Sequence, residues 1–239
     1  HFQPRFKVDG VTIASAEALV RWEHPRLGLL MPDDFVGLAE QSDVIVLLGN
    51  WVLQQACSEA GAWPLEVIVS VNMSPAQFSR SDVVRDVAEA LRTTGLPAHR
   101  LELEITENVM LNDVEGALQT MNALKELGVR LNMDDFGTGY SSLGYLRTYP
   151  FDSIKIDRRF VQSLGKSSSD RSVVQAIISL GNAMGMTVTA EGVETAEQLA
   201  LLSDDQCHEV QGYFLSRPVN NQALIKLMTS AATPSYTSD

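Results

Sequence analysis

Short apolar runs rich in Val, Ile and Leu alternate with longer stretches of helical period along nearly the whole chain. This alternation is typical of repeated βα units, because parallel strands need a crossover connection that a helix supplies. The predicted strands cover residues 2–8, 16–22, 67–72, 101–106, 130–134, 153–156, 187–191 and 209–213. About eight strands close a (β/α)8 barrel, so the sequence predicts an α/β fold of the TIM-barrel type.

The segments between the predicted strands are amphipathic and long enough to cross over a sheet. The predicted helices cover residues 33–60, with a break near Asp43, and 81–93, 113–127, 170–184, 196–203 and 222–228. A chain of 239 residues can bury one core of this size, and we expect one domain over residues 1–230.

Both ends of the chain carry expectations of their own. Residues 231–239 are small and polar without an apolar period, which predicts a flexible tail. The chain opens at His1, without a Met and beside a predicted strand, so we expect its amino end to be truncated from a larger protein.

Thirty acidic residues against 18 basic ones give a net charge of -12. This charge argues against binding to a nucleic acid polymer or an anionic membrane, whereas a small anionic substrate can bind where metal ions neutralise the site. No run reaches the ~18 to 20 apolar residues of a membrane helix, and Cys57 and Cys207 are expected to be reduced core residues. We therefore expect a cytoplasmic domain, whose parent protein can still be anchored in the inner membrane.

Polar residues stand where the predicted strands end, and in a barrel these ends meet on one face. They are Glu17, Asn72, Glu104, Asp134, Asp135, Lys155, Glu191 and Gln211. Carboxylates gathered there repel one another unless a counter-charge lies between them, and oxygen ligands without a His or Cys cluster favour Mg²⁺ or Mn²⁺. The residues alone predict a barrel hydrolase or lyase with one or two hard metals, and they leave the substrate open.

Two details sharpen this expectation. Adjacent Asp134 and Asp135 point to opposite sides of a strand unless the backbone turns, and Gly137 and Gly139 permit such a turn, so that the pair could serve two metals about 4 Å apart. A lone ammonium at Lys155 would be costly at the end of an apolar strand, so we expect Lys155 to face the acidic cluster. Taken singly, each residue also fits a solvated surface or a turn; their repetition at successive strand ends favours a site.

Seven motifs follow one another in order over nearly the whole chain. They are Glu17-Ala18-Leu19 with Val20-Arg21-Trp22, Val71-Asn72-Met73-Ser74, Glu104-Ile105-Thr106-Glu107, Asp134-Asp135-Phe136-Gly137-Thr138-Gly139-Tyr140-Ser141-Ser142, Ile154-Lys155-Ile156-Asp157, Ala190-Glu191-Gly192-Val193-Glu194 and Gln211-Gly212-Tyr213-Phe214. The set resembles the EAL-domain family of bacterial cyclic di-GMP phosphodiesterases. The resemblance implies a modified barrel whose first strand runs antiparallel to the others. It also implies hydrolysis of cyclic di-GMP to linear 5′-pGpG, by water that two divalent cations activate, in second-messenger signalling such as biofilm control.

The resemblance further implies a role for each site residue. Glu17, Asn72, Glu104, Asp134, Asp135 and Glu191 are the expected metal ligands, with Asp134 bridging two ions. Lys155, Glu191 and Glu17 are the expected catalytic residues, with Lys155 holding the attacking water. Gln3, Arg21 and Gln211 are expected to contact substrate or nearby water, and Glu107 to steady the loop of residues 134–142. The amino end departs from the family pattern, since no lead-in helix precedes Phe2-Gln3-Pro4.

Three functions stay open at this stage. The complete set of site residues favours an active phosphodiesterase, the alternative is a catalytically silent cyclic di-GMP receptor, and a different metal enzyme such as an enolase-like lyase can share the fold. The family also implies a homodimer formed near the segment that follows residue 142, with upstream regulatory domains in the full-length protein.

Overall fold

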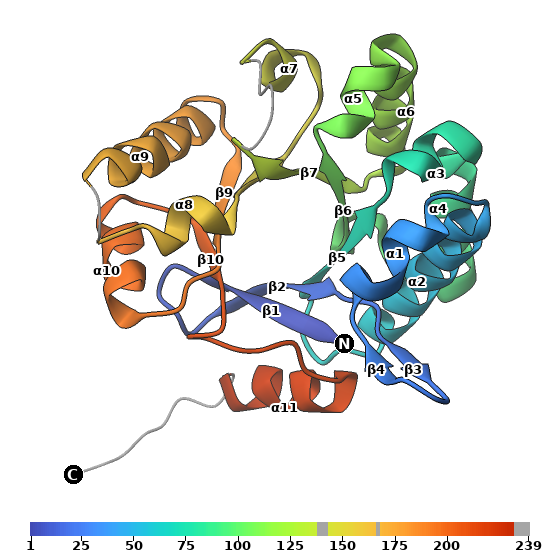
Figure 1. Ribbon diagram of the computed structural model, residues 1–239, viewed down its shortest axis with the longest axis horizontal. Helices are drawn as coiled ribbons and strands as arrows, with labels where there is room; N and C mark the ends of the chain where they lie inside the picture. The colour runs from blue at the N-terminus through green and yellow to red at the C-terminus, as the bar shows by residue number, and fades with distance from the viewer. Residues whose placement is uncertain (138–142, 166–167, 232–239) are drawn as a thin grey trace.

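The computed structural model describes residues 1–137, 143–165 and 168–231. Within these residues eight strands close into a barrel in the order β1-β10-β9-β8-β7-β6-β5-β2 (Figure 1). They are β1 (Phe2–Lys7), β2 (Ile13–Ala18), β5 (Ile68–Met73), β6 (Leu101–Thr106), β7 (Arg130–Phe136), β8 (Ser153–Ile156), β9 (Thr187–Glu191) and β10 (Glu209–Gln211). Strand β1 runs antiparallel to β2 and β10, and the other barrel pairs are parallel. The predicted barrel with one antiparallel strand is confirmed.

Helices surround this barrel (Figure 1). They are α1 (Pro32–Ala39), α2 (Val44–Gly61), α3 (Pro75–Arg80), α4 (Val83–Thr94), α5 (Asn108–Asn112), α6 (Val114–Leu127), α7 (Leu143–Thr148), α8 (Arg158–Gln162), α9 (Ser168–Ala183), α10 (Ala196–Asp204), α11 (Asn221–Ala231) and a 3₁₀ turn, η1 (Ala98–Arg100). The predicted break near Asp43 separates α1 from α2. The sequence did not predict α3, α5, α7 and α8, because five or six residues are too few to show a helical period.

The second predicted strand, residues 16–22, was placed too late. Strand β2 begins at Ile13 because β1 folds back at once through a tight turn, in which Asp9 Oδ1 accepts from the N–H groups of Val11 and Thr12 and Gly10 has φ +71°. Residues 22–30 form a separate antiparallel hairpin of β3 (Trp22–His24) and β4 (Gly28–Leu30). Small residues in β2 gave the start of this strand little apolar signal.

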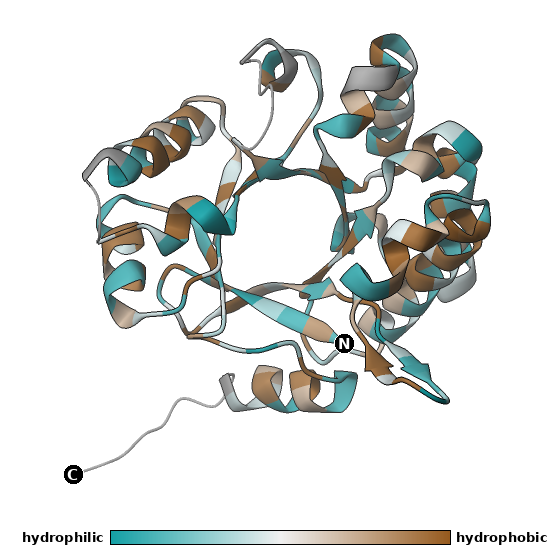
Figure 2. Ribbon diagram, in the orientation of Figure 1, coloured by the Kyte–Doolittle hydropathy of each residue, from teal (hydrophilic) through white to brown (hydrophobic). Residues whose placement is uncertain are grey.

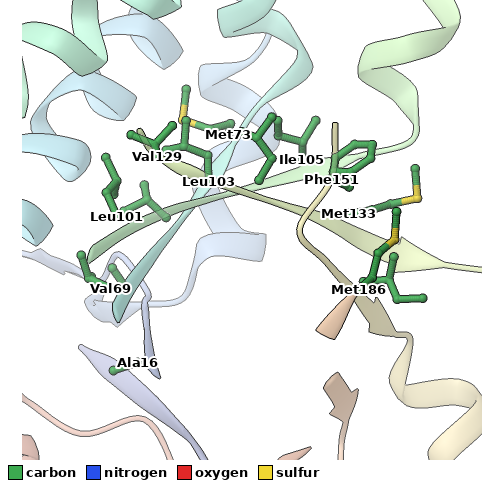
Figure 3. Packing of buried hydrophobic residues seen from close by; sticks show 14 of the residues in the cluster. Ala16, Val69, Met73, Leu101, Leu103, Ile105, Val129, Met133, Phe151 and Met186 are labelled. Atoms are coloured by element: carbon green, nitrogen blue, oxygen red, sulfur yellow. The ribbon is translucent and has the colours of Figure 1, made fainter. Parts of the chain in front are cut away.

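The hydrophobic core lies between the barrel and the helices. Figure 3 shows part of it, where Leu101, Leu103 and Ile105 of β6 pack with Val129 and Met73. The helices carry apolar and polar segments, as helices with one face on a barrel must (Figure 2).

The alternate residues of the strands are buried and polar, and they face the barrel interior. They include Arg5, Ser15, Glu17, Ser70, Glu102, Glu104, Asn132, Ser153, Lys155, Thr189, Glu209 and Gln211. The expectation of apolar strands with polar ends was therefore wrong: in this barrel the polar positions continue deep into the interior, where most barrels place Val, Ile and Leu.

Two smaller expectations can be compared with the fold. Cys57 and Cys207 are free and buried, and burial raises the pKa of each thiol to about 12. Across the described ranges, no helix has both the length and the apolar character that a membrane crossing needs. The predicted tail lies, after Ala231, outside the described residues.

Candidate active site

Lys155 stands at the centre of the candidate site. It is the third of the four residues of β8 and is 1% exposed. Its Nζ lies 2.5 Å from Glu191 Oε1, 2.7 Å from Glu104 Oε2, 3.3 Å from Asp134 Oδ1 and 3.5 Å from Glu17 Oε2. The structure thus brings together four carboxylates from β2, β6, β7 and β9 around one ammonium group.

Glu17 is held on both sides by amide groups. Asn72 Nδ2 of β5 donates to Glu17 Oε1 at 2.7 Å, and Gln211 Nε2 of β10 donates to Glu17 Oε2 at 2.8 Å. Burial raises the pKa of Glu17, but Lys155 and these two amides outweigh it and hold the pKa below its usual range. Glu17 therefore stays ionised and fixed in orientation.

The backbone turns at Asp135 itself, where φ is +55°. The pairing of β7 with β8 shifts register between Met133 and Phe136, so the turn is a bulge inside the strand rather than a turn after it. Sequence reasoning had assigned the turn to the glycines that follow. The bulge brings Asp135 to the same side as Asp134, where ligand oxygens of Asp134, Asp135 and Glu191 lie within 4.8 Å of one another.

The carboxylates raise one another's proton affinity. Burial, with the charges of Glu17 and Asp134, raises the pKa of Glu104 to about 8. Burial and the same two charges raise the pKa of Glu191 to about 7 against the opposing effect of Lys155. Burial and Asp134 raise the pKa of Asp135 to about 6, and its protonated carboxyl donates to Asp157. Lys155 alone does not neutralise the site.

The donor set fits hard divalent cations. Glu104 Oε1 is buried and has no hydrogen-bond partner among the described residues. Glu104 and the cluster of Asp134, Asp135 and Glu191 offer oxygen ligands only, which is what Mg²⁺ and Mn²⁺ prefer. Cations would also supply the positive charge that the elevated pKa values show to be lacking.

A pocket of about 260 Å³ opens over Lys155, and Glu17, Asp134 and Glu191 line it. Among the predicted substrate contacts, Gln3 and Gln211 line it and Arg21 does not. Arg21 donates to its neighbour's carbonyl, Val20 O, at 2.8 Å and lines two adjoining hollows. Glu107 is buried directly after β6, and the part of its expected loop at residues 138–142 lies outside the described residues.

Sequence reasoning missed several residues of this pocket. Arg158, Gln162, Glu194 and Tyr213 line it, and Asp157 contacts Asp135 from the end of β8. The available signal was position: all except Gln162, which ends α8, follow within three residues of β8, β9 or β10, at the strand ends that already carried the predicted residues. Arg158 adds a second positive charge, beside that of Lys155, to a pocket that four carboxylate side chains also line.

Fold and site together define a class of protein. It is a barrel with one antiparallel strand that gathers carboxylates and a lysine at the carboxyl ends of its strands, an arrangement suited to hydrolysis or lyase chemistry with hard metals. A sequence profile of the EAL domain matches residues 1–218. The chain belongs to the EAL-domain family.

Relatives and solved structures agree with this assignment. The chain is 44% identical to an uncharacterized signaling protein of Caulobacter vibrioides over 98% of its length and 43% identical to the cyclic di-GMP phosphodiesterase NbdA of Pseudomonas aeruginosa over 94%. It spans 29% of each of these two relatives. The solved PaMucR phosphodiesterase in its c-di-GMP complex has 38% identity and a TM-score of 0.90, covering 94% of this chain and 92% of that one.

Proposed function

We propose that this domain hydrolyses cyclic di-GMP to linear 5′-pGpG in a reaction that depends on two Mg²⁺ or Mn²⁺ ions. The observation that carries the proposal is the convergence of Glu17, Glu104, Asp134 and Glu191 on Lys155 beneath an open pocket. Membership of the EAL family, and a relative named as a cyclic di-GMP phosphodiesterase, support the choice of substrate.

The metal ligands of the proposal are Glu17, Asn72, Glu104, Asp134, Asp135 and Glu191. The cations, when bound, polarise the scissile phosphate and lower the pKa of water. Asn72 and Gln211 hold Glu17 in one orientation through their amide groups. Glu107, directly after β6, steadies the loop that follows Asp135. These contacts keep the ligand oxygens aimed into the site before the substrate binds.

Lys155 and Glu191 act on the attacking water. The Lys155 ammonium donates a hydrogen bond to the water and holds it in line with the phosphorus, and Glu191 accepts its proton. The new bond joins the water oxygen to phosphorus and the bond from phosphorus to the 3′ oxygen breaks. The departing oxygen takes up a proton from solvent to become the 3′ hydroxyl, and the product keeps a 5′ phosphate.

The pocket shape also supports a substrate with two bases. Leu19, of the Glu-Ala-Leu motif, lines both the pocket above Lys155 and a second hollow of about 260 Å³ that Asn72 and Pro32 border. The first hollow lies over Glu17, Asp134 and Glu191 and the second adjoins it at Leu19, and we infer that the two together take the two halves of the dinucleotide. Gln3 and Gln211 contact the substrate from the first hollow, and Arg21, from the adjoining face, contacts a phosphate after a change of rotamer.

The test is turnover of cyclic di-GMP by the purified domain with Mg²⁺ or Mn²⁺, with and without chelator, beside a Glu17→Ala variant. Formation of pGpG, followed by chromatography, should require both the cation and Glu17. Binding of cyclic di-GMP without turnover in any metal would contradict the proposal and favour the receptor alternative. Absence of binding would favour a different metal enzyme.

We further propose that the domain works as a homodimer inside a larger cytoplasmic signalling protein with upstream regulatory domains. The relatives support the larger size, since the matched segment makes up 29% of their length. Light scattering of the domain at high concentration should show twice the monomer mass, and a monomer throughout would contradict the dimer.

A further inference from the structure

Arg5 lies deep inside the barrel and has no part in the proposed chemistry. It is 1% exposed, and β1 places it one inward-facing position below Gln3, which lines the pocket. Burying a guanidinium group costs several kcal/mol unless partners compensate for the lost water. A cation at this depth therefore needs partners, and the structure shows two carboxylates of β6.

The first partner is Glu102. The Nη2 group of Arg5 donates to Glu102 Oε1, which also accepts from Asn132 Nδ2 at 3.1 Å. Ser153 Oγ donates to the other oxygen, Glu102 Oε2, at 3.1 Å. With donors from β1, β7 and β8, Glu102 is fixed, and it fixes the guanidinium group in turn.

The second partner is Glu104, a proposed metal ligand. Arg5 Nη2 lies 3.8 Å from Glu104 Oε1, while Lys155 Nζ lies 2.7 Å from Glu104 Oε2. The carboxylate thus stands between a cation below and a cation above. Because Glu102 and Glu104 are two residues apart on β6, they face the interior one above the other, and Arg5 reaches both.

We propose that Arg5 is a positioning residue of the active site, which holds the Glu104 carboxylate with Oε1 turned toward Arg5 and Oε2 turned toward Lys155 and the other carboxylates, the side on which a divalent cation binds. The inference rests on the proposed function, because it takes Glu104 as a metal ligand. Glu102 serves as the anchor that holds Arg5 at the required height. Neither Arg5 nor Glu102 touches the substrate in this arrangement.

Charge and geometry predict opposite effects, which makes the inference testable. Removal of a positive charge close to the site should by itself strengthen the binding of cations. Loss of a contact that orients a ligand should weaken it, by about 10- to 100-fold for the partners of metal ligands in general. A weakened affinity in a variant without Arg5 therefore reports on position and not on charge.

The variant that tests this is Arg5→Met combined with Glu102→Gln, which removes both charges and leaves no unpaired ion in the interior. Mn²⁺ affinity is measured by electron paramagnetic resonance of the free ion, with Arg92→Met combined with Glu89→Gln, an exposed ion pair of α4, as the control and the unfolding midpoint recorded for each variant. We expect Mn²⁺ binding about tenfold weaker in the double variant and near wild type in the control. Wild-type or tighter binding by a folded double variant would overturn the inference.

A second variant covers the case in which the double variant does not fold. Arg5→Lys keeps the charge but loses the planar guanidinium group whose Nη2 lies beside both carboxylates. It should bind Mn²⁺ several-fold more weakly than wild type, and unchanged affinity would overturn the inference. Assays of the wild type separate this outcome from a failure of the proposed function. If the wild type binds Mn²⁺ but does not hydrolyse cyclic di-GMP, only the proposed function is contradicted. If the wild type hydrolyses cyclic di-GMP and the Arg5 variants bind Mn²⁺ as tightly as it does, only the role of Arg5 is contradicted.

Discussion

At the scale of single residues, Lys155 has two roles, as a counter-charge for carboxylates and as a hydrogen-bond donor to water. In the protein without cations it is the counter-charge for Glu17, Glu104, Asp134 and Glu191. Burial lowers the pKa of the Lys155 ammonium, but the four carboxylates outweigh this effect and hold the pKa well above its usual value. The group therefore remains charged at neutral pH and can hold an attacking water.

Replacing Lys155 by Met should lower the rate of pGpG formation about a hundredfold or more. Met fills the space without donating a hydrogen bond, so the attacking water loses its donor while the carboxylates remain available to cations. Chromatographic assays at saturating Mg²⁺ measure the effect. Lys226→Met, at an exposed position of α11, is the matched control and should keep the wild-type rate. A Lys155→Met rate within a few-fold of wild type would contradict the assigned role.

At the scale of elements, the sequence predicted the strands that carry Val, Ile and Leu at alternate positions and failed where side chains are small or elements are short. The set of polar residues at strand ends was readable because each falls on the inward side of a strand. The bulge at Asp135 was not readable, since a positive φ at an aspartate depends on the tertiary contacts that hold it. Apolar and polar residues alternate strictly from Leu101 to Thr106. This alternation places Glu102 on the inward side of the strand below Glu104, but the sequence prediction did not use it.

The loop after β10 packs closely against the backbone that follows β9. A Cβ at Gly212 would overlap the backbone of Val193, which also exchanges hydrogen bonds with Gln211 and Phe214. We expect Gly212→Ala to lower the free energy of unfolding by about 1–3 kcal/mol and to reduce turnover, because the shift moves Gln211 away from Glu17. Gly37→Ala in α1, where a Cβ meets nothing within 4 Å, is the control and should leave stability equal or slightly higher. The measurement is denaturant unfolding of both variants. Equal unfolding midpoints for Gly212→Ala and Gly37→Ala would contradict the close approach of Gly212 to Val193.

At the scale of the whole molecule, this barrel reverses the usual distribution of polarity. Its apolar packing lies outside the strands, and its interior holds charged and amide side chains whose partners come from across the barrel. Such an interior is stable only when nearly every charge is compensated. Arg5 compensates Glu102 in the depth of the barrel, whereas the mouth holds more negative charge than Lys155 balances. Stability and cation binding are therefore coupled in one structure.

This coupling predicts how stability depends on pH. In the protein without cations, Glu104 and Glu191 keep their protons up to pKa values of about 8 and about 7, whereas the unfolded chain releases them near about 4.3. The unfolded state binds fewer protons in this window, so stability should fall as pH rises from about 5 to about 8.

Cations should reverse the trend, because they bind the ionised carboxylates and stabilise the folded state more as pH rises. The measurement is the Tm with saturating Mg²⁺ and with chelator, at about pH 6 and about pH 8.5. We expect the gap between the two Tm values to widen at the higher pH, and Glu104→Gln, which cannot ionise, to show a smaller change in the chelated protein. A gap that stays constant would show that Glu104 and Glu191 do not bind the cation, and the metal centre would then have to be sought elsewhere in the barrel mouth.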